Sequence, residues 1–247
     1  MLVEPAGPLN VGSVARLCAN FGIDELRLVA PRCDPGGDEA RRMAVHGGAL
    51  LERARHFPDL AAALADCRRV VATSGRIEQE ALPLVTPDAA LQWLLAGEGQ
   101  EPAADGWGAL VFGREDRGLS NDELLQAGRV LRLDTGAAYS SLNLSHAVAI
   151  CLHELQRQRQ GTPPASVPPV HDTAADSTPC PRAALEATLA DAETLLLEVG
   201  FLYPHTAHAR MAKLRALLQR AQVRDAELAL LRGMVRQLRW AAERRTP

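Results

Sequence analysis

Four segments rich in small and polar residues follow short apolar runs, and together they could bind a ligand. They cover residues 4–13, 73–76, 113–121 and 134–143. Small residues let a ligand approach the main chain closely, where N–H groups can recognise the edges of adenine and ribose. Each segment could also be a plain turn with a helix cap: Ser120 and Glu123 fit a capping box, and Asn143 fits a cap.

Other kinds of site have little support. The sequence contains neither a GxGxxG dinucleotide fingerprint nor a GxxxxGK[ST] phosphate loop, which argues against a usual dehydrogenase or P-loop ATPase. His205 and His208 lie three residues apart, but no third ligand is evident, so no metal is expected. The five cysteines include no CxxC pair, which argues against a zinc site and a disulfide framework.

The elements that must position these segments alternate between strands and helices. Apolar runs predict strands over 2–3, 26–30, 70–73, 109–112 and 130–133, and helical patterns cover 11–20, 38–54, 58–66, 87–95, 121–126 and 143–156. Short apolar strands separated by helices are typical of an α/β fold with a mostly parallel sheet. Because ligands bind beyond the carboxyl ends of parallel strands, the four segments are expected to share one edge.

Proline divides the chain. Six prolines between residues 156 and 181 exclude a helix or a central strand there, so we expect a first domain over 1–157, a linker over 158–181 and a helical domain over 182–247. Helical spacing covers 182–199 and 213–243. The last domain holds 11 basic and 7 acidic residues, a charge of +4, whereas residues 1–181 hold 16 and 23, a charge of −7.

Composition sets the class of protein. The 247 residues are 47% hydrophobic and 23% charged, with a net charge of −3, which excludes a wholly disordered chain. No apolar run approaches the roughly 20 residues that span a bilayer, and no secretory signal opens the sequence. We therefore expect a cytoplasmic protein without a membrane partner.

Three stretches resemble the signature motifs of the SPOUT class of RNA 2′-O-methyltransferases, the TrmH-like enzymes. They cover residues 10–16 with 20–22, 110–115 with 118–121, and 139–145 with 147–149, in the order found in that family. Residues 211–215 and 230–236 resemble the helical extension of the bacterial subgroup that methylates the ribose of nucleotide 32 in the tRNA anticodon loop.

The resemblance implies a parallel-sheet α/β domain with a C-terminal trefoil knot, plus a small all-helical C-terminal domain. It implies a homodimer with the active site at or near the interface, S-adenosylmethionine as the cofactor without a metal, and tRNA as the partner. The cofactor would lie against Thr73, Ser74, Gly75, Gly113, Leu133, Ser140, Ser141 and Leu142. The catalytic positions would be Asn10, Arg16, Glu115, Ser141 and Asn143.

Arg16 is the residue expected to act on the ribose hydroxyl. A guanidinium has a pKa above about 12 and no acceptor, so holding the target phosphate and stabilising the developing alkoxide suits it better than general-base work, which stays open. The alternative interpretation is that Arg16 is a solvated arginine on a helix without a catalytic role. Arg114 and Glu115 could likewise form only a surface ion pair.

RNA binding is expected from Arg16 and from the basic C-terminal domain through Arg210, Lys213, Arg215 and Arg232. The alternative for this domain is a solvated amphipathic face or a dimer helix. For the whole protein, the alternatives are the same methylation of ribosomal RNA and an RNA-binding protein of this fold without activity.

Overall fold

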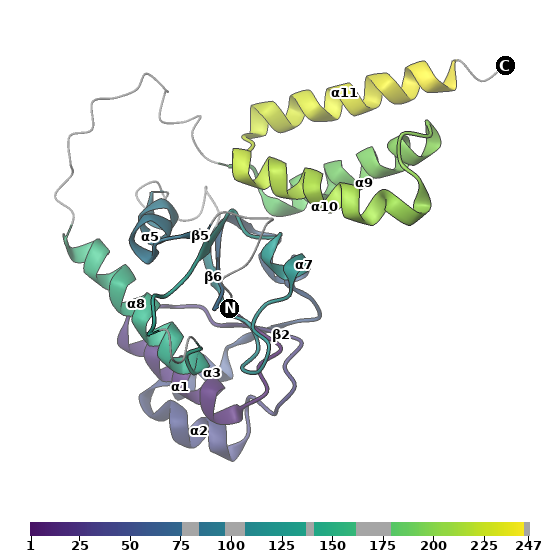
Figure 1. The fold of residues 1–247 in the computed structure, drawn as a ribbon. Helices are drawn as coiled ribbons and strands as arrows, with labels where there is room; N and C mark the ends of the chain where they lie inside the picture. The colour runs from purple at the N-terminus through teal and green to yellow at the C-terminus, as the bar shows by residue number, and fades with distance from the viewer. Residues whose placement is uncertain (76–83, 97–106, 137–140, 162–178, 245–247) are drawn as a thin grey trace.

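A parallel β-sheet forms the centre of the N-terminal part of the molecule (Figure 1). The computed structural model describes residues 1–75, 84–96, 107–136, 141–161 and 179–244. One group of strands has the order β1 (Leu2–Val3), β2 (Arg27–Val29), β3 (Arg55–Phe57). The other has the order β5 (Leu84–Val85), β7 (Arg129–Leu131), β4 (Cys67–Thr73), β6 (Trp107–Val111). Every pairing in both groups is parallel.

The two groups of strands meet between β1 and the end of β6. Val3 N donates to Phe112 O at 2.9 Å, and Phe112 N donates to Met1 O at 3.0 Å. The bridge between Leu2 and Phe112 is also parallel. The carboxyl ends of β1, β6, β4 and β7 therefore lie along one edge of a continuous surface.

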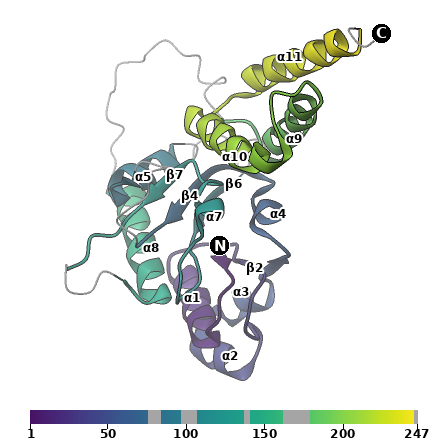
Figure 2. The ribbon, with the colours of Figure 1, turned by 45° about the vertical axis from the view of Figure 1, so that its right-hand side comes forward.

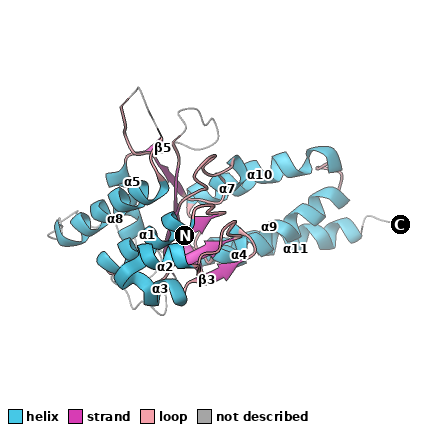
Figure 3. Cartoon of the chain, turned by 90° about the horizontal axis from the view of Figure 1, so that it is seen from below, coloured by secondary structure: helices cyan, strands magenta, loops and turns pink. Residues whose placement is uncertain are grey.

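Helices cover both faces of the sheet (Figure 3). One face packs against α1 (Pro8–Asn20), α2 (Asp38–Ala44), α3 (Gly48–Glu52), α5 (Pro87–Leu95) and α8 (Leu144–Gly161). The other face packs against α4 (Leu60–Leu64) and α7 (Asn121–Leu124). Buried on both faces, the strands read as short apolar runs without alternation.

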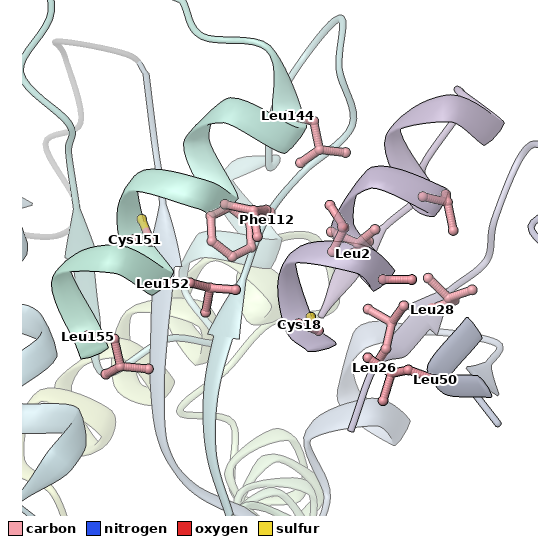
Figure 4. Packing of buried hydrophobic residues seen from close by; sticks show 14 of the residues in the cluster. Leu2, Cys18, Leu26, Leu28, Leu50, Phe112, Leu144, Cys151, Leu152 and Leu155 are labelled. Atoms are coloured by element: carbon pink, nitrogen blue, oxygen red, sulfur yellow. The ribbon is translucent and has the colours of Figure 1, made fainter. Parts of the chain in front are cut away.

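The core under α8 explains why this segment is a helix. Its apolar residues recur every three or four positions, which places Leu144, Cys151, Leu152 and Leu155 on one buried stripe. Figure 4 shows this stripe facing Phe112 and the α1 residue Cys18. The contact fixes the start of α8 beside α1.

Three further helices, α9 (Arg182–Glu198), α10 (Pro204–Ala221) and α11 (Asp225–Glu243), form a unit with its own apolar core. In Figures 1 and 2 this helical unit lies at the end of the molecule away from α1, α2 and α3. Arg68 Nη1 donates to Pro179 O at 2.7 Å, and Ala183 N donates to Ala65 O at 3.3 Å. The unit is thus attached where β4 begins.

The five expected strands are present, and β3 and β5 are two that the sequence pattern did not predict. The expected helix over 38–54 is interrupted at Val45, whose φ is 47°, and continues through the short turn η1 (Val45–Gly47) into α3. The expected helix over 213–243 is two helices, because Gln222 has a φ of 54°. α8 continues past residue 157 to Gly161. Among the described residues, no helix combines the length and the apolar character that crossing a membrane requires.

Candidate active site

Residues expected to bind the cofactor follow three neighbouring strands at one edge of the sheet. Thr73 ends β4, and Gly113 and Leu133 lie two residues beyond the ends of β6 and β7. Thr73 Oγ1 donates to Val111 O at 3.2 Å, and Ser74 N donates to Leu131 O at 3.0 Å. These two bonds tie the three strand ends together, so the loops leave the sheet side by side.

The three sequence motifs meet in a chain of side-chain hydrogen bonds. Asn10 Nδ2 donates to Glu115 Oε1 at 3.0 Å, and Asn143 Nδ2 donates to Asn10 Oδ1 at 3.1 Å. The residues joined lie 105 and 133 positions apart in the chain. One residue from each motif therefore contributes to a single site at the carboxyl edge.

Glu115 is held by the main chain of the loop after β1. Its carboxylate accepts from Ala6 N at 2.9 Å and from Gly7 N at 3.0 Å, in addition to Asn10. Partial burial acts to raise the pKa of Glu115, but the hydrogen bonds from Ala6, Asn10 and Gly7 outweigh it, and the pKa lies below its ordinary value. The side chain is an anion that organises this loop.

Asn143 caps α8, as its position in the sequence predicts. Its Oδ1 accepts from Ser145 N at 2.9 Å, from Ser145 Oγ at 2.8 Å and from His146 N at 3.4 Å. Because the oxygen is occupied by the helix end, the amide nitrogen points to Asn10. The cap therefore fixes which way the chain of hydrogen bonds runs.

The loop after β6 is folded tightly upon Gly113. A Cβ at this position would lie 2.2 Å from the carbonyl carbon of Gly118, so only glycine fits. Gly118 itself has a φ of 68°, and its N–H donates to Arg114 O at 2.8 Å. Ser120 and Glu123 form the predicted capping box at the start of α7.

Sequence reasoning missed a cluster of arginines around Glu4. This carboxylate accepts from Arg32 at 2.9 Å, from Arg117 at 2.9 Å and from Arg114 at 3.3 Å. Hydrogen bonds from Arg32 and Arg117 lower the pKa of Glu4 to about 2. Arg114 also bonds Asp116 at 2.6 Å, so no Arg114–Glu115 ion pair forms. The signal in the sequence was an acid directly after a strand and an arginine-rich loop after another.

Arg16 lies apart from this network. It is exposed on α1, six residues and therefore about 9 Å along the helix from Asn10. No residue in the described part of the chain forms a hydrogen bond or an ion pair with its guanidinium. Ser141, Leu142 and Gly75 are also exposed, and Ser140 lies outside the described residues.

The expected RNA-binding residues of the helical unit differ in their surroundings. Lys213 is exposed on α10. Arg215 bonds Glu186 at 2.9 Å, Arg210 donates to Phe201 O at 3.1 Å, and Arg232 donates to Thr188 Oγ1 at 3.0 Å. These three arginines hold the helical unit together in this structure.

Comparison with known proteins gives two family matches. The model of the SpoU rRNA methylase family matches residues 1–153, and that of the tRNA methyltransferase TrmJ C-terminal domain matches residues 183–247.

Individual relatives match nearly the whole chain. A protein of Pseudomonas aeruginosa named tRNA (cytidine/uridine/adenosine-2′-O-)-methyltransferase TrmJ is 33% identical over 239 residues, which are 95% of this chain and 91% of the relative. A protein of Klebsiella pneumoniae named tRNA (cytidine/uridine-2′-O-)-methyltransferase TrmJ is 34% identical over 237 residues, 95% of this chain and 93% of the relative. The crystal structure of TrmJ from Z. mobilis ZM4 superposes with a TM-score of 0.81 at 31% identity, over 96% of this chain and 97% of that one.

Proposed function

Because the chain belongs to the SpoU methylase family and is therefore a methyltransferase, we propose that it methylates a ribose 2′-hydroxyl of tRNA with S-adenosylmethionine as the donor. The observation that carries this proposal is the chain of hydrogen bonds from Glu115 through Asn10 to Asn143. It lies at the carboxyl edge, beside the loops after β4, β6 and β7, where an α/β sheet binds its ligand.

The residues at this edge fit the proposed cofactor. Thr73, Ser74 and Gly75 offer main-chain groups, and Leu133 offers a half-buried apolar side chain, which suits a ligand with both polar edges and an adenine ring. S-adenosylmethionine supplies an activated methyl group when bound. Ser140, Ser141 and Leu142 complete the proposed contact from the segment before α8.

Positioning is the main task left to the protein. A sulfonium is a good leaving group, so aligning the donor with the hydroxyl can supply roughly 7 to 11 kcal/mol of the barrier reduction. Glu115, Asn10 and Asn143 hold the loops that face each other across the site. Ser141 lies two residues before the helix cap and is exposed.

Arg16 is the residue that we propose acts on the substrate. Its guanidinium is exposed, and no described residue pairs with it, so it is available for the phosphate beside the target ribose. A cation there also stabilises charge that develops on the 2′-oxygen as its proton leaves.

The helical unit favours tRNA as the substrate. Its match to a tRNA methyltransferase domain and its charge of +4 support a role in RNA binding, with Lys213 as an exposed contact and Arg210, Arg215 and Arg232 as further basic residues of the same unit. We propose nucleotide 32 of the anticodon loop as the target. We also propose the division into 1–157, 158–181 and 182–247, and a cytoplasmic location, where tRNA is found.

A homodimer is part of the proposal. Exposed apolar side chains flank the site: Leu9 precedes Asn10 and is 53% exposed, Leu142 precedes Asn143, and Ile150 on α8 is 45% exposed. Asn10 and Asn143 are bonded to each other, so these leucines lie near one another. A second copy that covered them would place the site at the interface. The trefoil knot remains part of the same proposal.

The test combines methyl transfer with mapping of the product. Purified protein, S-adenosylmethionine and tRNA from a strain lacking the enzyme are incubated, and ribose methylation is mapped by mass spectrometry. We expect a single 2′-O-methyl group at nucleotide 32. In the Arg16→Ala variant, cofactor binding by calorimetry should be unchanged, and turnover should fall about 100-fold or more.

Arg42→Ala is the matched control, because Arg42 is an exposed arginine on α2 that belongs to none of the three motifs. Turnover of Arg16→Ala near that of the control would remove Arg16 from the mechanism. Methylation of ribosomal RNA alone would show that ribosomal RNA, not tRNA, is the substrate. Absence of cofactor heat in the wild-type protein would identify an inactive RNA-binding protein.

A further inference from the structure

A hollow lies where the helical unit meets the start of β4, and its lining is unusual. It measures about 340 Å³ including its open mouth. Arg68 and Trp93 line it from the α/β domain, and Arg182, Leu218 and Gln219 line it from the helical unit. None of the described residues that line it is acidic.

Gln219 is buried on α10 without a partner. It is 5% exposed, and neither Oε1 nor Nε2 of its side chain has a hydrogen bond within the described chain. The indole Nε1 of Trp93 is likewise buried and unbonded. Buried polar groups in native proteins are almost always satisfied, so groups left open in one hollow point to something that binds there.

Arg182 adds a buried positive charge to the same hollow. It is 7% exposed and forms no hydrogen bond with any described residue. Burial lowers the pKa of Arg182 to about 10. The carboxylate of Glu186, which attracts Arg182, is already bonded by Arg215 at 2.9 Å. A largely buried cation is stabilised by a neighbouring negative charge, so an anion in the hollow would interact favourably with Arg182.

We propose that this hollow binds a phosphate-type oxyanion that joins the helical unit to the α/β domain. Arg182, the Gln219 amide and the Trp93 indole donate from the walls. Arg68, which also forms an ion pair with Asp225 at 3.7 Å, adds a fourth group from the start of β4. An oxyanion can accept hydrogen bonds from several donors at once, whereas a cation would be repelled by the two arginines. The hollow suits a small group rather than a large ligand.

The site is separate from the proposed catalytic loops, which lie at the opposite ends of the strands. The phosphate group could be a free ion or part of the RNA backbone, since both present the same oxygens to the donors. Either would stabilise the docking of the two parts of the chain, because the donors come from both.

Thermal unfolding of the full chain with inorganic phosphate tests the proposal. Phosphate is compared with chloride at matched ionic strength. At about ten times its Kd, phosphate should raise the Tm by about 3 °C. The shift should disappear in Arg182→Met and in Gln219→Leu. Gln219→Leu should also raise the Tm without phosphate, because leucine has a similar volume to glutamine and lacks the two unpaired polar atoms.

Arg42→Met on α2 and Gln92→Leu on α5 are the matched controls, both at exposed positions, and should keep the shift. Equal Tm values in phosphate and chloride for the wild-type protein would overturn the proposal, as would an unchanged shift in Gln219→Leu. A second arm measures tRNA binding at matched ionic strength. If phosphate competes with tRNA in the wild-type protein but not in Gln219→Leu, the group belongs to the RNA backbone. If the Tm shift occurs without competition, the ligand is a free anion.

Discussion

Glu115 shows why a carboxylate, rather than an amide, is needed at this position. Two main-chain N–H groups and the Asn10 amide all donate to it. Glutamine would turn its own NH₂ group towards one of these donors, so at least one hydrogen bond would be replaced by a repulsive contact. The loop after β1 would then lose its attachment to the loop after β6.

Replacing Glu115 with glutamine should lower kcat/KM by about tenfold or more, because hydrogen bonds to a charged group contribute roughly 1.5 to 3 kcal/mol. The folded-state pKa of Glu115 is lowered, so its stabilisation is present above the ordinary value of 4.5 and is lost as the pH falls through the folded pKa. Urea unfolding should therefore show a constant difference between wild type and variant above pH 5 that shrinks in acid.

Glu52→Gln, at an exposed position at the end of α3, is the control and should show neither effect. A Glu115→Gln enzyme with wild-type kcat/KM would contradict the role given to this carboxylate.

Some residues of the site could be found from the sequence and others could not. Asn10, Glu115 and Asn143 stand out because their side chains carry chemistry, and the structure joins all three. The partners Ala6 and Gly7 act through their main chain, so their residue types give no signal. Glu4 was overlooked because its three arginines come from two distant loops.

At the scale of elements, the loop after β6 depends on the absence of one side chain. Gly113→Ala would place a methyl group 2.2 Å from main-chain carbon, and backbone cannot move aside as a flexible side chain does. We expect a loss of about 1 to 3 kcal/mol in the free energy of unfolding, together with a large loss of methyl transfer as Glu115 is displaced.

Urea unfolding and the methyl-transfer assay measure both effects. Gly48→Ala is the control, because a Cβ there meets no atom within 4 Å and the residue is helical. The control should be neutral or slightly stabilising. Equal stability of the two variants would show that the loop yields and that the close contact is not needed.

The sequence predicts an element well where its burial produces a clear hydrophobic pattern. The strands around β4 are apolar and bounded by turn residues, and they were expected within a few residues of their observed bounds. β3 has the sequence Arg-His-Phe and lies at a sheet edge, so it contains no apolar run that would predict a strand. The break at Val45 was not predicted, because a β-branched residue rarely takes a positive φ.

At the scale of the molecule, charge is divided between two parts that carry −7 and +4. The acidic α/β domain repels RNA, so a basic surface elsewhere is needed to bind it. The exposed Lys213 is the chain's single lysine, so a reagent specific for lysine side chains would report on that surface.

Deleting residues 182–247 should weaken tRNA binding and flatten its dependence on salt, while cofactor binding and a dimeric mass by light scattering persist. Lys213→Glu should act in the same direction in the full-length chain, and tRNA should protect Lys213 from amine-reactive reagents. Glu52→Lys serves as a charge-change control at an exposed position of α3. Unchanged tRNA affinity after the deletion would assign the helical unit a role other than RNA binding. A monomeric mass of the full-length chain would remove the dimer from the proposal.

The attachment of the helical unit at the start of β4 sets a minimum size for the substrate. β4 has seven residues and so separates its two ends by about 20 Å, with the methyl-transfer loops at the far end. A nucleotide held in those loops therefore lies well away from the point where the helices are attached. Recognition therefore depends on an RNA whose own folding carries it over that span, and a short single-stranded fragment would lose one of its two anchoring points.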